Sequence, residues 1–123
     1  MPYPKTHFYP LALFAIWVFS HSVHAEGVLL KSSPEDNAQL SQFDGKINLW
    51  FSGNVGERYP SLIVVNGKGQ RVDNHDVKLE IAKRSQLQVT TKALTPDHYV
   101  MRYRVVTEDG LVVSGIRKFS IIP

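Results

Sequence analysis

The sequence predicts an all-β protein built as a sandwich of two sheets, with about seven or eight short strands. Apolar and polar residues alternate along several segments, and turn residues separate these segments. No window of 11 or more residues carries an apolar stripe with helical spacing. Because alternate side chains of a strand point to opposite faces, each segment is expected to have one buried and one wetter face.

The first two strands are expected over residues 28–33 and 46–52. The first ends at the turn-forming run Ser33-Pro34-Glu35-Asp36-Asn37. In the second, Ile47, Leu49 and Phe51 alternate with Lys46, Asn48 and Trp50.

Four shorter strands are expected next, over residues 61–66, 70–73, 77–82 and 85–91. Asn66-Gly67-Lys68-Gly69 separates the first two, and Asn-Gly predicts a tight hairpin because both residues accept positive φ angles. In the other two, the apolar residues that alternate with polar ones are Leu79 and Ile81, then Leu87 and Val89.

The last two strands are expected over residues 98–107 and 112–122. Thr95-Pro96-Asp97 precedes the first, in which Tyr99, Met101, Tyr103 and Val105 share one face. Asp109-Gly110 predicts a tight turn between the two strands, with the Asp109 carboxylate capping nearby backbone N–H groups.

The first 25 residues have the pattern of a cleaved export signal. Lys5 precedes an apolar stretch from Phe8 to Phe19, which is shorter than the roughly 20 residues that span a bilayer. Val23 and Ala25 fit the −3 and −1 positions of a peptidase site, so cleavage is expected after Ala25. We therefore expect a signal peptide over 1–25, one domain over 26–123, and no membrane insertion after cleavage.

Composition excludes several classes of function. The chain has no cysteine, which rules out thiolate metal sites and cysteine nucleophiles. Loss of Lys5 with the signal lowers the formal net charge from +3 to +2, which does not argue for binding nucleic acid. No catalytic triad, paired carboxylates or phosphate loop stands out, so we expect no enzyme activity.

Four local patterns, in their order and spacing, resemble the CopC-like family of periplasmic copper-resistance proteins over nearly the whole mature chain. They are Ser32-Ser33-Pro34 with Leu40, the strand Ile47–Ser52, the strand Tyr99–Val106, and Asp109-Gly110 followed by Ser114-Gly115 and Phe119-Ser120-Ile121. The resemblance implies an exported Greek-key β-sandwich, immunoglobulin-like or cupredoxin-like. It also implies a periplasmic copper carrier with a CopD-like inner-membrane partner.

The resemblance further implies a Cu(II) site made of an N-terminal histidine and an Asp-x-His motif, a nitrogen and oxygen set that suits Cu(II). In this chain the N-terminal position is Glu26, the Asp is Asp109, and the His position is Leu111. Glu26 and Asp109 are thus the expected metal ligands, and binding should be weak or lost. The methionine-rich Cu(I) site of some members has no counterpart, because Met101 is expected to lie in the core.

Histidines elsewhere leave two alternatives open. Cleavage after Val23 would make His24 the N-terminal residue, at the cost of a poor peptidase site. Recruitment of His75 or His98 is the other, although His75 in Asp73-Asn74-His75-Asp76 and His98 at a strand end are both expected to be solvated surface residues.

Two further features remain undecided at this point. Arg102, Arg104, Arg117 and Lys118 form either a basic patch for an acidic partner or an ordinary solvated face. Trp50, opposite in direction to Phe51, either packs under a loop or is an exposed contact.

The predicted function is copper homeostasis or resistance in the periplasm, as a weak carrier or a soluble partner of a membrane copper protein. The alternative is a metal-free interaction module that has lost copper binding. The sequence does not determine the copper oxidation state, the partner or the oligomeric state.

Overall fold

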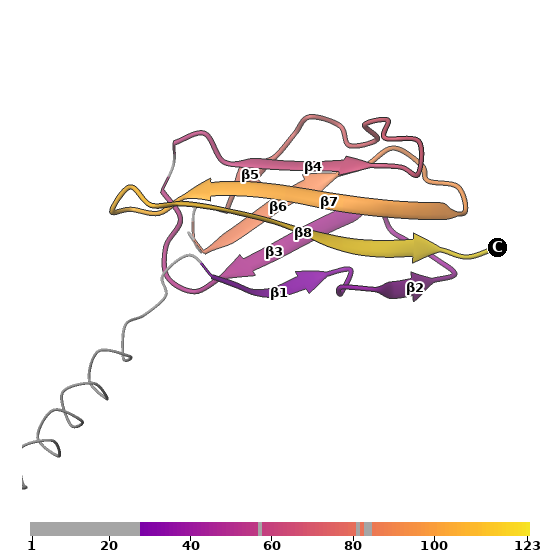
Figure 1. The fold of residues 1–123 in the computed structure, drawn as a ribbon, viewed down its shortest axis with the longest axis horizontal. Helices are drawn as coiled ribbons and strands as arrows, with labels where there is room; N and C mark the ends of the chain where they lie inside the picture. Colours follow the sequence, from indigo (N-terminus) through magenta and orange to yellow (C-terminus); the bar gives the residue numbers. More distant parts are fainter. Residues whose placement is uncertain (1–27, 57, 81, 83–84) are drawn as a thin grey trace, which may run out of the picture.

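The structure, a computed structural model, describes residues 28–56, 58–80, 82 and 85–123, which form two sheets of four strands packed face to face (Figure 1). One sheet has the strand order β1-β3-β6-β5 and the other β2-β8-β7-β4. The strands are β1 (Leu29–Ser33), β2 (Ala38–Leu40), β3 (Lys46–Phe51), β4 (Ser61–Val65), β5 (Lys78–Leu79), β6 (Gln86–Thr90), β7 (Asp97–Val106) and β8 (Val112–Ile121). The predicted all-β sandwich is confirmed.

The core lies between the sheets and follows the predicted alternation. In β7, Tyr99, Met101, Tyr103 and Val105 are buried while Arg102 and Arg104 are exposed. Met101 is fully buried, which confirms its expected place in the core. The other sheet contributes Ile47, Leu49 and Phe51 of β3 and Leu87 and Val89 of β6.

The chain repeatedly changes sheet, and one such change produces a strand that the sequence did not predict. After β1 in the first sheet, the chain turns at Pro34 and enters the second sheet as β2, which pairs in parallel with Phe119–Ile121 of β8. Three residues are too few to show an alternating pattern, so this strand left no periodic signal.

The predicted strand over 70–73 is wrong. This segment crosses between the sheets and makes isolated bridges, Arg71 with Val65 and Asp73 with Thr91. The Asp73 carboxylate, rather than a backbone carbonyl, accepts the N–H of Val64 at 2.9 Å, so a regular ladder with β4 does not form. Expected strands 77–82 and 85–91 shorten to β5 and β6, and Ile81 lies outside the described residues.

The turn after β4 also differs from the expected Asn-Gly hairpin. The left-handed residue is Gly69, with φ of +78°, and neither Asn66 nor Gly67 has a positive φ. The Asn66 side chain instead accepts the N–H groups of Lys68 and Gln70, each at 2.9 Å. The turn is therefore a wider loop closed by an asparagine side chain.

The fold brings the start of the described chain to the end of the sandwich that carries the β7–β8 hairpin (Figure 1). Val28 pairs with Ser52, since the Ser52 N–H donates to the Val28 carbonyl at 2.8 Å. Three residues further on, Val55 forms a bridge with Thr107, where the hairpin begins. No helix of the described residues is long and apolar enough to cross a membrane.

Candidate functional site

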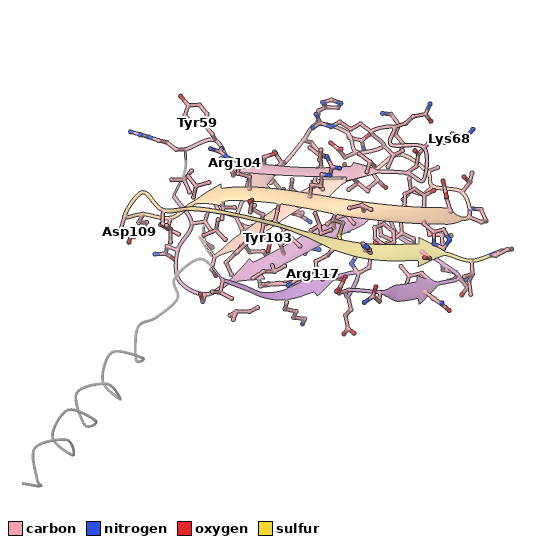
Figure 2. All side chains as sticks on the ribbon, in the orientation of Figure 1. Tyr59, Lys68, Tyr103, Arg104, Asp109 and Arg117 are labelled. Carbon is pink, nitrogen blue, oxygen red and sulfur yellow. The ribbon has the colours of Figure 1, made fainter. Side chains whose placement is uncertain are left out.

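The β7–β8 hairpin holds Asp109 at its tip, which projects from one end of the sandwich (Figure 2). The Gly110 N–H donates to the Thr107 carbonyl at 2.9 Å, and the Thr107 N–H donates to the Leu111 carbonyl at 2.8 Å. Gly110 has a φ of +92°, a conformation that favours glycine. The predicted turn is confirmed, and Asp109 is exposed within it.

Thr107 organises this hairpin, and it was not singled out in the sequence. Its hydroxyl donates to the Asp109 carboxylate and accepts the Leu111 N–H at 3.0 Å, while the residue itself is only 2% exposed. A Thr two residues before an Asp-Gly pair is the sequence signal that could have identified it. The Asp109 carboxylate, which was expected to cap backbone N–H groups, therefore also accepts a hydrogen bond from the Thr107 side chain within the loop.

The hydrogen bond from the Thr107 hydroxyl, assisted by backbone N–H groups, lowers the pKa of Asp109 below its ordinary value. The exposed carboxylate is thus ionised at neutral pH, as an oxygen ligand for a cation must be. One of its lone pairs is used inside the loop, which leaves the others open to solvent.

Leu111 stands where the resemblance places a histidine ligand, and its side chain is 56% exposed. The Leu111 carbonyl accepts the Thr107 N–H, and the Leu111 N–H donates to the Thr107 hydroxyl. The position therefore has a fixed backbone and a solvent-facing side chain that cannot bind metal.

The other expected ligand, Glu26, lies outside the described residues, as do His24 and the predicted signal peptide over 1–25. The nearest described residue, Val28, is fixed by two hydrogen bonds with Ser52, at 2.8 and 3.1 Å.

A shallow hollow of about 620 Å³ adjoins Asp109, lined by the hairpin residues 106–110 together with Gly56 and Arg58. Its charged groups are the carboxylates of Glu108 and Asp109 and the guanidinium of Arg58. The positive charge of Arg58 disfavours binding of a metal cation in this hollow, because like charges repel each other. No motif in the sequence singles out Arg58.

Among the residues that the structure describes, no group of three or more His, Asp or Glu side chains could hold a metal ion. Of the two expected ligands, only Asp109 falls in this part of the chain. A complete site would need a donor from outside the described residues.

His98 cannot join Asp109, because the two residues lie at opposite ends of β7. His98 pairs with Ser120 near the start of this ten-residue strand, and its Nδ1 lies 2.8 Å from the Ser120 hydroxyl oxygen. At roughly 3.3 Å per residue, the strand separates the two ends by about 30 Å. The structure thus rules out a site shared by His98 and the hairpin.

His75 does not form a metal site with its neighbouring carboxylates either. Asp73 is fully buried and accepts hydrogen bonds from the Val64 N–H, the His75 N–H and the Arg71 guanidinium. Asp76 accepts the Thr90 N–H at 2.9 Å and the Thr90 hydroxyl. Both carboxylates therefore have structural roles, and His75 itself is exposed.

Burial raises the pKa of Asp73, but hydrogen bonds from Arg71, Val64 and His75 outweigh this effect and hold the pKa below its ordinary value of 3.8. Hydrogen bonds from Thr90 likewise lower the pKa of Asp76. Ionised carboxylates at these two positions therefore stabilise the folded state.

We expect the thermal unfolding midpoint to be nearly constant from pH 7 to pH 5. At pH values below about 4 we expect this midpoint temperature to decrease. A carboxyl group whose pKa is lower in the folded than in the unfolded state stabilises the fold at pH values above its unfolded-state pKa. This stabilisation is lost as the pH falls through the folded-state pKa. Thermal melts monitored by circular dichroism would test this, with Asp73→Asn as the comparison. A drop of equal size in Asp73→Asn would mean that Asp73 does not cause it.

The four basic residues of the possible patch divide between two faces. Arg102, Arg104 and Lys118 lie on the outer face of their sheet, because Arg102 is opposite Ile116 and Lys118 is opposite Val100. Arg117 is opposite the buried Met101 and so points the other way, at an edge of the sandwich. On the other sheet, Trp50 is half-buried, with the Lys31 ammonium 4.9 Å from its ring centre.

Comparisons with known proteins agree with this architecture. The family model described as CopC domain matches residues 29–122. The copper transport protein CutJ of Bacillus subtilis (strain 168) is 33% identical over 114 residues, which cover 90% of this chain and 20% of CutJ. The chain therefore spans about a fifth of the length of this relative.

Two solved structures are similar in fold. The structure of CopC from Methylosinus trichosporium OB3b has a TM-score of 0.73 and 26% identity, covering 79% of this chain and 94% of that one. PcoC, a methionine-rich copper resistance protein from Escherichia coli, has a TM-score of 0.64 and 20% identity, covering 79% of this chain and 99% of that one. The likeness to PcoC shows the fold alone.

Proposed function

The chain belongs to the CopC domain family, and we propose that it serves copper homeostasis or resistance in the periplasm. In this proposal residues 1–25 are a cleaved signal peptide and residues 26–123 are the working domain. The domain acts as a weak Cu(II) carrier or as the soluble partner of a membrane copper protein of the CopD type, and it is not an enzyme.

The observation that carries the copper role is the position of Asp109. Its ionised carboxylate lies on a hydrogen-bonded hairpin, at the end of the sandwich where the described chain begins. The amine and carboxylate of Glu26 would complete a donor set of one nitrogen and two oxygens, a type that suits Cu(II). Leu111 supplies no imidazole and Arg58 adds a positive charge, so this set should bind weakly.

Asp109→Ala is expected to reduce Cu(II) affinity at least about tenfold, because even partners outside a metal's first coordination shell contribute 10–100-fold. The measurement is a competitive Cu(II) titration of the exported protein, with its N-terminus established by mass spectrometry. Glu108→Ala is the matched control, since Glu108 is an exposed acid on the same hairpin. Equal affinities of Asp109→Ala and the parent protein would eliminate Asp109 as a ligand.

A metal-free interaction module is the second candidate function. Its support is the replacement of two family ligands together, by Glu26 and Leu111, and the exposure of apolar side chains at this end of the sandwich. Tyr59 is 80% exposed and Leu111 is 56% exposed. Affinity capture from the cell envelope tests this role, and the recovery of no periplasmic or membrane partner would count against it.

A further inference from the structure

Strand β8 is paired along its whole length on one side and only at its end on the other. It runs antiparallel to β7 from Val112 to Ile121. On the opposite side, β2 pairs only with residues 119–121, which is visible in Figure 1. The loop before β2 forms hydrogen bonds with the backbone of Lys118. The Lys118 N–H donates to the Asp36 carboxylate at 2.9 Å, and the Lys118 carbonyl accepts the Asn37 N–H at 2.6 Å. Within the described chain, no strand pairs with residues 112–117 on this side.

The hydrogen bonds of Lys118 show which backbone groups face the open side. In an antiparallel pair, successive residues direct their N–H and C=O groups alternately toward and away from the neighbouring strand. Because Lys118 points away from β7, Val112, Ser114 and Ile116 do so too. The hydrogen bond of the Ile116 carbonyl is consistent with this direction, since this carbonyl accepts from the Arg117 guanidinium at 2.9 Å and not from β7. Three residues therefore direct strand-pairing groups toward this edge, and of these groups the Ile116 carbonyl is bonded to the Arg117 side chain.

This edge lacks the features that usually prevent strand addition. Natural edges carry charged side chains, prolines, bulges or a covering loop. Residues 111–116 include no charge and no proline, and the pairing with β7 continues without a bulge. Val112 is 51% exposed and Ile116 is 48% exposed. By contrast, β1 at the neighbouring edge has a register irregularity between Leu29 and Lys31.

We propose that β8 is a self-association edge, at which a second copy of this chain adds its own β8 in antiparallel orientation around a two-fold axis at Ser114. Ser114 then lies opposite Ser114 of the partner subunit, and Val112 lies opposite Ile116 of the partner subunit, twice by symmetry. Opposite residues in such a pair share one face. The two exposed apolar side chains therefore cover each other.

The charges along β8 favour this antiparallel arrangement. The acidic Glu108 and Asp109 lie on the hairpin before β8, and the basic Arg117 and Lys118 lie in the second half of the strand. Antiparallel pairing places the basic end of one copy beside the acidic hairpin of the other, whereas parallel pairing places like charges together. Arg117 exchanges its bond to the Ile116 carbonyl for a contact with the acidic hairpin.

Sedimentation velocity of the metal-free exported protein tests the proposal, with chelator present so that copper plays no part. We expect a concentration-dependent shift from monomer to dimer. Ser114→Pro should weaken the dimer about tenfold or more, because it removes the central donor twice while leaving the ladder to β7 intact. Ser114→Ala keeps that donor and should change the affinity by less than about twofold. A thermal melt verifies that Ser114→Pro is folded.

A charge exchange then tests the orientation. Arg117→Glu and Glu108→Lys should each weaken self-association, because each places like charges together. An equimolar mixture of the two variants should restore a heterodimer. A parent protein that is monomeric at every concentration, or a dimer insensitive to Ser114→Pro, would overturn the proposal. So would a mixture that stays monomeric. Because no copper is present, none of these outcomes bears on the proposed copper role.

Discussion

Combining Leu111→His with Glu26→His is expected to raise the affinity for Cu(II) by about a hundredfold or more. The double change restores both imidazoles of the family's ligand set and retains Asp109. Since partners outside the first shell alone contribute 10–100-fold, two direct nitrogen ligands should contribute no less. Competitive titration with a chelator of known affinity measures the change, on protein whose mature N-terminus is residue 26.

The structure gives reasons to expect that the hairpin accepts this change. The Leu111 side chain is more than half exposed, so a histidine there loses little packing. Thr107 bonds both the Leu111 backbone and the Asp109 carboxylate, so it connects the two positions within the hairpin. Preorganisation of this kind lowers the entropic cost of binding.

The single variants and one control separate the possible causes. Leu111→His alone and Glu26→His alone should each give a smaller gain than the double variant. Leu111→Ala removes the apolar side chain without adding a ligand and should leave the affinity unchanged. If the double variant bound Cu(II) no better than Leu111→Ala, the N-terminus would not reach the hairpin, and the proposed donor set of Glu26 and Asp109 would fail with it.

Long strands with strict alternation were the predictable part of the fold. The alternation from Tyr99 to Val105 identified β7 to within a residue or two, because each buried side chain on one face repeats the signal. The alternation of apolar and polar residues did not identify the three-residue β2 or the crossing of segment 70–73 between the sheets. In both, tertiary contacts decide the conformation: parallel pairing with Phe119–Ile121 in one case and the Asp73 carboxylate in the other.

At the candidate site, residue types were predictable and their surroundings were not. The Asp109-Gly110 turn follows from local chemistry, so the sequence located it correctly. Arg58 comes from the distant β3–β4 loop, and nothing in its local sequence connects it to Asp109. Whether Arg117 shares a face with Arg102 was left open by the sequence, because strand pairing, not proximity in sequence, determines the face.

Asp73→Ala is expected to lower the free energy of unfolding by about 3 kcal/mol, because hydrogen bonds to a charged group contribute about 1.5–3 kcal/mol and Asp73 is fully buried. The substitution leaves the N–H of the fully buried Val64 without its acceptor, at a cost of about 1–3 kcal/mol. It also removes the acceptor of the His75 N–H and the partner of Arg71. Small domains have only about 5–15 kcal/mol of stability, so this loss would leave the protein marginal.

Urea unfolding measures the effect, and Asp44→Ala is the matched control. Asp44 also accepts a backbone N–H, that of Lys46 at 3.0 Å, but it is exposed and water can replace it. Its removal should cost less than about 1 kcal/mol. Similar losses in the two variants would mean that burial does not determine the contribution of Asp73. A much larger loss in Asp73→Ala would support a stabilising role for this buried carboxylate in addition to the backbone bridges of segment 70–73.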